Sequence, residues 1–559
     1  MNQLIRASAG SGKTYQLSSH FLRRLFQGQR PDSILATTFT RKAAGEILGR
    51  VLLRLAEAAL SDEKAAELQQ SLEAGEISRS RALSMLGELT RSVHRLRICT
   101  LDSFFQQAAR GLTLELGLTP GWTIVDPHVD VDLREQAIDA VLAQQLPQDA
   151  QQLMQMLAKG KYRRSVRMLI DETVQQFHEL YQQTAESAWQ QVPQGQRLSG
   201  QVLQQVLQAL QSVELPSDKR IATARDEDLR RFSAEAWDEF ISKGIAAKVL
   251  EGESTFYRKE LSDEVQQLYG RLLQHAKAVL LERLTLQMQA IRSLISRFDV
   301  EFSRLRAEHG WLGFSDVTRT LARAVEAANG KRLNYRLDSS LRNLLLDEFQ
   351  DTSGDQWKVL RRLVDSLRQH QDSSVFCVGD GKQAIYGWRG GMAEILDAVP
   401  VAVPGILETG LNQSRRSAPA VIEAVNQVFQ HLTSHPELAE YRDAVARWQE
   451  RFPQHETVKS SETGYAVFRT EPAFEGETVG EKRGPRNAWL AQQIAELHLQ
   501  MPDREIGVLT RGNAAVARLV HELTALGIPA SEEGGTAPTD SPAVLAVLAM
   551  LQFASHPAC

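Results

Sequence analysis

Short apolar runs alternate with stretches of helical spacing in the first part of the chain. Segments such as Leu4–Ile5, Ile34–Phe39 and Leu344–Leu346 have the apolar character of buried parallel strands. Between them, Thr14–Phe26 repeats its apolar residues at the spacing of a helix. A further strand pattern follows at Ser374–Val378. Strands that alternate with helices predict an α/β fold built on a parallel sheet.

A long helical region interrupts this alternation. From about Thr119 to Arg297 strand patterns nearly vanish, and residues rich in Gln, Leu and Arg recur at helical spacing. We interpret residues 119–297 as a helical domain inserted into the α/β domain. The α/β domain then consists of residues 1–118 and 298–398.

A second α/β domain is expected after a linker at Pro400–Pro404. Leu411–Ile422 opens a helix, Glu505–Arg511 has the pattern of a strand, and Ala514–Leu526 that of the next helix. This domain is assigned residues 399–559, and it stops unfinished in helical pattern.

Composition narrows the class of protein. The 559 residues are 43% hydrophobic and 24% charged, with a net charge of −5, typical of a globular protein of several domains. Without an apolar stretch of membrane length or a signal peptide, a cytoplasmic protein with no membrane partner is expected. The 3 cysteines are too few for a disulfide framework or a zinc site. The net charge leaves room for a local basic groove that holds nucleic acid.

A glycine-rich turn follows the first predicted strand. Its glycines let backbone N–H groups approach phosphates, Lys13 supplies a point charge, and Thr14 offers a hydroxyl to a metal ion at a helix N-terminus. The turn is a phosphate-binding loop with Ala where the first Gly is usual. The alternative is a turn that only connects the strand to the helix and binds no phosphate. The candidate nucleotide-binding residues of the loop are Ala7, Ser8, Ala9, Gly10, Ser11, Gly12, Lys13 and Thr14.

An acidic pair ends the strand at Leu344–Leu346. Asp347 is a candidate Mg²⁺ ligand, and Glu348 is placed to take a proton from an attacking water. A solvated acidic turn is the alternative for this pair alone. Because parallel sheets bind ligands at the carboxyl ends of their strands, the glycine-rich turn and the acidic pair together predict a site of nucleoside triphosphate hydrolysis.

Two strand ends carry candidates for nucleic-acid contact. Phe39 and Thr40 are followed by two cations, a combination that can hold a base and a backbone, although an ordinary solvated helix start remains open. Farther on, we expect Thr100, Ser103 and Phe104 to be exposed at the turn between a strand and a helix.

The strand at Ser374–Val378 leads into a third candidate segment. Tyr386 and Trp388 with the adjacent Arg389 suit the stacking of unpaired bases beside a phosphate contact, unless the two rings are buried in a domain seam. Gln383 lies between them and the strand end. We expect it to sense the γ-phosphate and to report its loss to the aromatic residues.

With these segments identified, the chain resembles the UvrD/Rep-type superfamily 1A DNA helicases, and within them the RecB/AddA branch, over nearly its whole length. The matching motifs are Ala7–Thr14, Thr38–Arg50, Thr100–Phe104, Asp347–Gln356 and Gly379–Gly391. The resemblance implies a P-loop NTPase with a RecA-like parallel sheet domain, a large helical insertion and an incomplete second RecA-like domain.

The resemblance also implies an activity and its residues. It implies an ATP- and Mg²⁺-dependent motor that moves 3′ to 5′ on single-stranded DNA and separates duplex ends in repair or recombination, with a possible nuclease subunit or domain. Asp347 and Thr14 would bind Mg²⁺, Glu348 would act as general base, and Gln383 would contact the γ-phosphate. Arg416 would reach the γ-phosphate from the second domain. The implied DNA contacts are Phe39, Thr40, Ser103, Phe104, Tyr386, Trp388 and Arg389.

The sequence departs from the family pattern at three points. Arg415 stands where the family has an aromatic residue that stacks on adenine, and a guanidinium plane can stack there instead. The glutamine that reads adenine has only Gln3 as a candidate. Nothing matches motifs V and VI or a nuclease signature, so we expect a fragment of a longer helicase. An ATP-regulated single-stranded DNA-binding subunit without processive unwinding is the alternative.

Overall fold

The computed structural model describes residues 2–73, 75–144, 166–326, 341–387, 390–474, 479–532 and 542–555. Trp388 and Arg389, two of the expected DNA contacts, lie outside these residues. The chain divides into two compact units. Unit 1 comprises residues 1–417 and 426–460, and unit 2 comprises residues 418–425 and 461–559.

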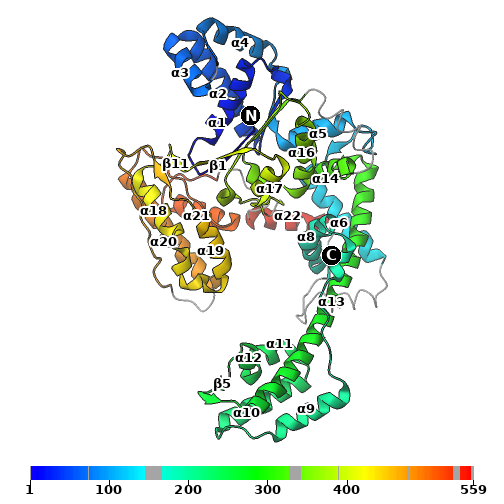
Figure 1. Ribbon diagram of the computed structural model, residues 1–559. Coiled ribbons are helices and arrows are strands. Elements are labelled where there is room, and N and C mark those ends of the chain that lie inside the picture. The colour runs from blue at the N-terminus through cyan, green and yellow to red at the C-terminus, as the bar shows by residue number, and fades with distance from the viewer. Residues whose placement is uncertain are drawn as a thin grey trace. The chain divides into compact units, whose positions relative to one another are not determined.

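A parallel six-stranded sheet organises unit 1 (Figure 1). Its strands run in the order β10-β1-β9-β8-β2-β3, and every neighbouring pair is parallel. The predicted α/β class with a parallel sheet is therefore confirmed. The strands are β1 (Gln3–Ala7), β2 (Ile34–Thr38), β3 (Arg97–Thr100), β8 (Asn343–Leu346), β9 (Ser374–Gly379) and β10 (Leu407–Leu411).

Alternate residues of the central strands point into two separate cores, because successive side chains of a strand face opposite sides. Leu344 and Leu346 belong to one core, whereas Leu345 between them belongs to the other. Helices cover both faces, as Figure 1 shows. One face carries α1 (Lys13–Phe26), α2 (Arg41–Leu60), α3 (Asp62–Leu72) and α4 (Arg79–Arg91). The other carries α5 (Leu101–Gly111), α14 (Phe314–Glu326), α16 (Gly354–Leu367) and α17 (Ile395–Ala402).

The predicted helical insertion is present, and it has two cores. The chain leaves the α/β part through β4 (Thr123–Ile124) and returns through β7 (Trp311–Leu312), which pair in parallel. Near this junction α6 (Pro127–Ala143) and α8 (Val166–Gln183) pack on the C-terminal half of α13 (Asp263–Glu308). Because α13 is one helix of 46 residues, the boundary predicted at residue 297 falls inside it.

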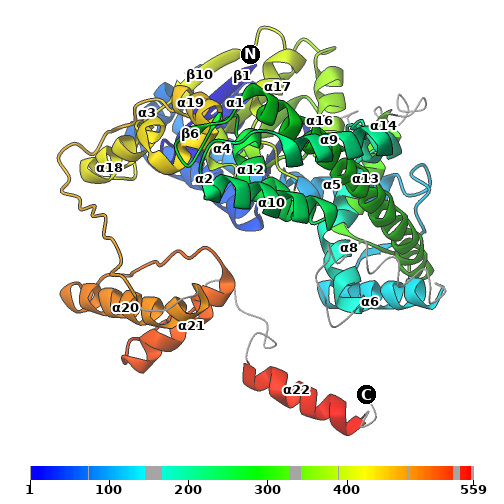
Figure 2. The same cartoon turned by 90° about the horizontal axis from the view of Figure 1, so that it is seen from below.

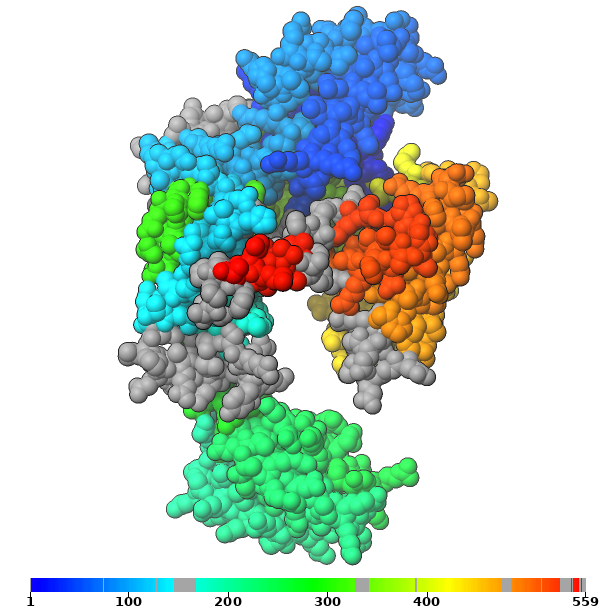
Figure 3. All heavy atoms as spheres, turned by 180° about the vertical axis from the view of Figure 1, so that it is seen from behind, coloured from blue at the N-terminus to red at the C-terminus, as the bar shows by residue number. Residues whose placement is uncertain are grey.

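The N-terminal half of α13 carries what we call the outer lobe, residues 198–280, which forms a compact mass in Figure 3. Aromatic and aliphatic side chains from all of its helices fill one core. Its other elements are α9 (Gly200–Ser212), α10 (Lys219–Ser233), α11 (Trp237–Ser242), α12 (Gly244–Leu250), β5 (Thr255–Phe256) and β6 (Lys259–Glu260).

Two expectations about the C-terminal part differ from the structure. β10 lies beyond residue 399, yet it pairs with β1, so the first sheet extends past the predicted domain boundary. Glu505–Arg511 has a strand pattern but forms no strand. A parallel strand requires a hydrogen-bonded neighbour, and the described part of unit 2 contains no strand that pairs with it.

Unit 2 is helical in its described part. α20 (Val479–Gln500) and α21 (Asn513–Ala525) lie side by side (Figure 2) around a small core of Ala491, Leu519 and Leu523. α22 (Pro542–Ser555) follows, and α18 (Pro419–Phe429) begins in unit 2 and ends in unit 1. Unit 1 also contains α19 (Arg442–Glu450) and the short pair β11 (Gln413–Ser414) and β12 (Glu456–Thr457). Among the helices described, none combines the length and apolar character that a membrane crossing needs.

A buried carboxylate fixes the outer lobe. Asp228 on α10 is fully buried and accepts hydrogen bonds from the backbone N–H groups of Ile245 (2.8 Å) and Ala246 (3.2 Å) at the start of α12. Gly244 precedes them at φ 70°, and a Cβ atom there would lie 2.1 Å from Oδ1 of Asp228. This close approach requires glycine.

We therefore predict that Gly244→Ala destabilises the outer lobe by about 2–4 kcal/mol, because it adds a steric clash to an unfavourable φ. Hydrogen exchange at the amides of Ile245 and Ala246 measures the effect locally and should accelerate. Gly200→Ala is the matched control, since no atom lies within 4 Å of its added Cβ. Equal exchange in both variants would show that the contact does not hold the lobe.

Candidate nucleotide site and nucleic-acid interface

The glycine-rich loop between β1 and α1 has the shape of an anion cradle. Gly10 (φ 72°) and Gly12 (φ 96°) adopt left-handed backbone conformations. α1 then begins at Lys13 without a side-chain N-cap and without an acidic residue in its first turn. The first N–H groups of such a helix lack intrahelical partners, so they suit a phosphate.

Lys13 connects this loop to the acidic pair after β8. Its ammonium donates to Oε2 of Glu348 at 2.7 Å and to Oε1 of Gln383 at 3.3 Å. The side chain of Lys13 is only 9% exposed. The glycine-rich loop, the acidic pair and the Gln383 segment therefore meet at the carboxyl ends of β1, β8 and β9. Lys13 lies 335 residues before Glu348 and 370 before Gln383 in the sequence.

Glu348 is held in a strained backbone conformation at φ 47°. Such a conformation persists only where surrounding contacts fix it. Besides Lys13, the amide of Gln350 donates to the Glu348 carboxylate at 2.8 Å, and the Gln350 carbonyl oxygen accepts from the backbone N–H of Asp380 at 2.9 Å. Gln383 in turn donates to the Asp380 carboxylate at 2.7 Å. A hydrogen-bond network therefore links the ends of β8 and β9.

Asp347 is buried beside Glu348. Burial and the neighbouring Glu348 carboxylate raise the pKa of Asp347 to about 7, against the opposing effect of Lys13. The same two causes raise the pKa of Asp351 to about 6. Carboxylates that are costly to ionise alone are suited to a divalent cation, and Mg²⁺ commonly takes one or two protein oxygens together with phosphate oxygens. Asp347 with the hydroxyl of Thr14 fits that donor set.

Arg415 and Arg416 lie against the glycine-rich loop. The backbone N–H of Arg415 donates to the Gly10 carbonyl at 2.8 Å. A Cβ on Gly10 would lie 2.9 Å from the Cβ of Arg416. Both arginine side chains are exposed. They follow β10 within unit 1, so the loop and these arginines belong to one compact unit.

Phe39 and Tyr386, both expected to contact DNA, stack on each other. Their ring centroids are 4.5 Å apart with an interplanar angle of 29°. Thr40 is exposed, and its side chain accepts from the backbone N–H of Ala43 as the N-cap of α2. An aromatic pair at the same sheet edge as the phosphate loop is a platform on which a base can stack.

The turn after β3 differs from the prediction. Thr100 and Phe104 were expected to be exposed, but they are 7% and 6% exposed. Phe104 packs in a core with Phe105 because the first turn of α5 faces the sheet. Ser103 is half-buried and shares a 2.7 Å hydrogen bond with the hydroxyl of Thr100. In this conformation Phe104 does not offer its ring to a ligand.

A groove extends from Phe39 between α8 and α14. It encloses about 770 Å³, and its walls include Phe39, Arg134, Phe314 and Gln356. Phe314 is 54% exposed, an unusual state for a phenylalanine. Phe314 was not predicted as a site residue. It is the first residue of α14, and an aromatic residue at a helix start indicates a binding surface only when the groove beside it is known.

The raised pKa of Asp347 predicts a pH-dependent stability. A folded pKa of about 7 against an ordinary 3.8 means that the folded state binds the proton more tightly. Stability contributed by the protonated carboxyl is therefore lost as pH rises between these values. Asp347→Asn should stabilise the nucleotide-free protein by roughly 1–2 kcal/mol above pH 7 and much less near pH 4.

Thermal unfolding across this pH range checks the prediction. The exposed Asp372→Asn is the control, and its stability should follow that of the unmodified protein at every pH. A stability difference between the Asp347→Asn variant and the unmodified protein that does not change with pH would contradict the assignment.

Comparison with known proteins is consistent with this geometry. Residues 1–401 match the family model of the UvrD/REP helicase N-terminal domain. An ATP-dependent helicase/nuclease subunit of Bacillus pumilus is 23% identical over 99% of this chain and 50% of its own length. RecBCD enzyme subunit RecB of Escherichia coli is 24% identical over 76% of this chain and 38% of its own. Subunit RecB of Mycobacterium tuberculosis reaches 38% identity over 130 residues, 23% of this chain and 11% of its own.

The chain spans about half the length of the first of these curated relatives. The match to the family model covers more than two thirds of the chain and contains the glycine-rich loop, the acidic pair and the Gln383 segment. The resemblance deduced from the sequence motifs is therefore confirmed. The chain belongs to the UvrD/REP helicase family.

Proposed function

We propose that this chain is the motor part of an ATP-dependent DNA helicase that moves 3′ to 5′ along single-stranded DNA during repair or recombination of broken ends. The observation that carries the proposal is the contact of Lys13 with both Glu348 and Gln383. Gln383 lies three residues before Tyr386, which belongs to the aromatic pair. Nucleotide chemistry and strand contact are thereby adjacent.

The proposed roles in hydrolysis follow from the contacts. The glycine-rich loop and Lys13 hold the phosphates of ATP, while Asp347 and Thr14 hold Mg²⁺, which neutralises charge on the phosphate oxygens. A γ-phosphate attracts Lys13 away from Glu348, because a phosphate carries more negative charge than one carboxylate. Glu348 is then available to accept the proton of the attacking water. Arg416, beside Gly10, reaches toward the same phosphates.

Coupling to DNA is proposed to run through Gln383. Loss of the γ-phosphate returns Lys13 to Glu348 and Gln383, and the segment from Gln383 to Tyr386 moves with this exchange. The Phe39–Tyr386 stack then alternates between the closed form seen here and an open form that admits a base. Thr40 and Ser103 contact the sugar–phosphate backbone of the DNA strand. Arg415 is proposed to stack on adenine.

The test of the ATPase uses two substitutions. Lys13→Ala should abolish ATP binding and hydrolysis. Glu348→Gln should keep ATP binding but lower the hydrolysis rate by about 10²–10⁴-fold, because glutamine has the size of glutamate but cannot accept the proton of the attacking water. ATP binding is measured by titration with a fluorescent ATP analogue. Hydrolysis is measured as steady-state phosphate release with and without single-stranded DNA, which should stimulate the unmodified protein.

Lys64→Ala is the control, since Lys64 is an exposed lysine on α3 that pairs with the exposed Glu67 and has no part in the site. Unchanged hydrolysis in the Lys13→Ala variant would refute the proposal.

The direction of movement is measured by displacement of a protein block from the 3′ or the 5′ end of a strand. Strand binding without displacement from either end would favour the alternative, in which the chain binds DNA under the control of ATP but does not unwind it. A nuclease partner, suggested by the names of the relatives, is sought by co-purification.

The DNA interface predicts a second set of effects. Phe39→Ala and Phe314→Ala should each weaken binding of single-stranded DNA by about 1–3 kcal/mol, because each removes a stacking surface in the groove. Fluorescence anisotropy with a labelled oligothymidylate measures this. Tyr441→Ala, which removes an exposed ring elsewhere in unit 1, is the control. Equal affinity of all variants would place the strand outside the groove.

A further inference from the structure

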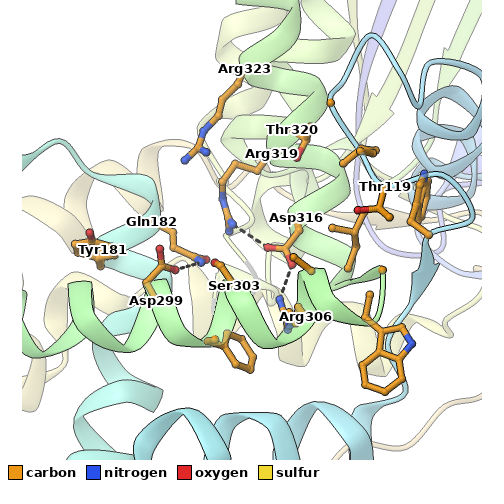
Figure 4. Close-up of a pocket in the computed structure, with 18 of the residues that line it drawn as sticks. Thr119, Tyr181, Gln182, Asp299, Ser303, Arg306, Asp316, Arg319, Thr320 and Arg323 are labelled. Atoms are coloured by element: carbon orange, nitrogen blue, oxygen red, sulfur yellow. Dashed lines mark hydrogen bonds and ion pairs between the residues drawn. The ribbon is translucent and has the colours of Figure 1, made fainter. Parts of the chain in front are cut away.

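A second cavity lies at the root of the helical insertion, on the far side of a wall that it shares with the groove. It encloses about 560 Å³, within the range of small-molecule sites. Figure 4 shows α14 and α13 facing each other across it, with Arg319 and Arg323 projecting from α14 and Asp299 and Arg306 from α13. None of its lining residues has a role in the nucleotide site.

Two arginines line this cavity, Arg319 buried and Arg292 half-buried. Arg319 is 8% exposed and donates through Nη1 to Asp316 at 3.0 Å. Arg292 pairs with the exposed Glu186 at 3.0 Å. In both arginines Nε is buried and has no hydrogen-bond partner in the described part of the chain. Buried donors are nearly always satisfied in proteins, so two orphaned guanidinium donors around one cavity indicate a missing acceptor.

The acids of the cavity do not supply this acceptor. Asp316 is already engaged by Arg306, Arg319 and the backbone N–H of Gly313. Burial would raise the pKa of Asp299, but hydrogen bonds from His178 and Gln182 bring it below its ordinary value. The Asp299 carboxylate is therefore ionised and engaged by its own partners. An anionic ligand with several oxygens would satisfy the remaining guanidinium donors.

Aromatic side chains complete the walls. The indole N–H of Trp122 donates to Thr113 at 3.3 Å, and that of Trp189 donates to Thr184 at 2.9 Å. Trp311 and Tyr181 line the same cavity. Trp122 and Trp189 are also buried in the adjoining cores (5% and 7% exposed), so the half-buried Trp311 and Tyr181 offer the ring surface that a ligand can reach. Guanidinium groups beside aromatic rings recognise a phosphate beside a base.

We propose that this cavity binds a nucleotide unit, with its phosphate at Arg292 and Arg319 and its base against Trp311 and Tyr181. Its source is the single strand. Gln182, Phe302, Arg306, Asp316 and Arg319 line both the cavity and the groove that contains Phe39, so a strand in the groove lies one wall away. This source rests on the proposed function. A free nucleotide has the same chemistry and is tested separately.

The experiment compares unmodified protein with Arg292→Ala and Arg319→Gln. Binding is measured for oligothymidylates of increasing length and, independently, for deoxythymidine monophosphate. We expect both variants to bind the longest oligonucleotides about 5–20-fold more weakly, with a smaller salt dependence, and the shortest with unchanged affinity. Arg292→Ala should disturb the fold less than Arg319→Gln, because Glu186, the partner of Arg292, is exposed and leaves no buried charge unpaired. Arg297→Ala, an exposed arginine on α13 outside the cavity, is the control and should bind as the unmodified protein does.

A photoreactive thiothymidine at each end of the longest oligonucleotide, in turn, locates the strand. Cross-links to peptides containing Trp189 or Trp311 would support the proposal. Binding of the monophosphate that is lost in both variants, without a length effect, would identify a free nucleotide as the ligand. If neither probe distinguishes the variants from the control, the cavity is not a nucleotide site. Failure of the unmodified protein to bind any strand would count against the proposed function, and the monophosphate would still test the cavity.

Discussion

The ion pair between Lys13 and Glu348 is the contact on which the arrangement of the site depends. A lysine that is 9% exposed needs a counter-charge, since burying an unpaired ammonium is costly. The counter-charge comes from a residue 335 positions away in sequence. This is possible because β9 lies between β1 and β8, and all three strands are parallel. Their carboxyl ends therefore share one edge, where the glycine-rich loop, the acidic pair and Gln383 converge.

The same edge explains why the aromatic pair lies near the phosphate loop. Phe39 follows β2, and Tyr386 follows the turn after β9. Both strands are direct neighbours of β8, so the two rings lie at the same edge of the sheet. The sheet is a rigid scaffold, whereas the turns at its edge can adopt more than one conformation. In the proposed mechanism, a change of partner at Lys13 would pass over a short path of turns and would not require the sheet to deform.

The helical insertion depends on a second set of charges. Arg306 near the C-terminus of α13 pairs with Asp130 on α6 and with Asp316 on α14. Asp316 also accepts from Arg319, so carboxylates and guanidinium groups alternate across the junction of the insertion with the α/β part. These partly buried pairs join α13 to α6 and α14, and Arg306, Asp316 and Arg319 form part of the wall between the groove and the second cavity.

The sequence alone determined the fold class, the family and the segments that meet at the nucleotide site, because strand length, glycine spacing and an acidic pair are local patterns. It did not determine the exposure of Phe104, since a residue in the first turn of a helix can face either the solvent or the sheet. Nor did it locate the end of the sheet at β10, because a short strand of mixed exposure lacks a clear apolar run. Glu505–Arg511 has the pattern of a strand but lacks a described partner, and pairing is a property of two segments. Phe314, the shared wall and the orphaned arginine donors appear only in the tertiary structure, because they depend on helices far apart in sequence packing against one another.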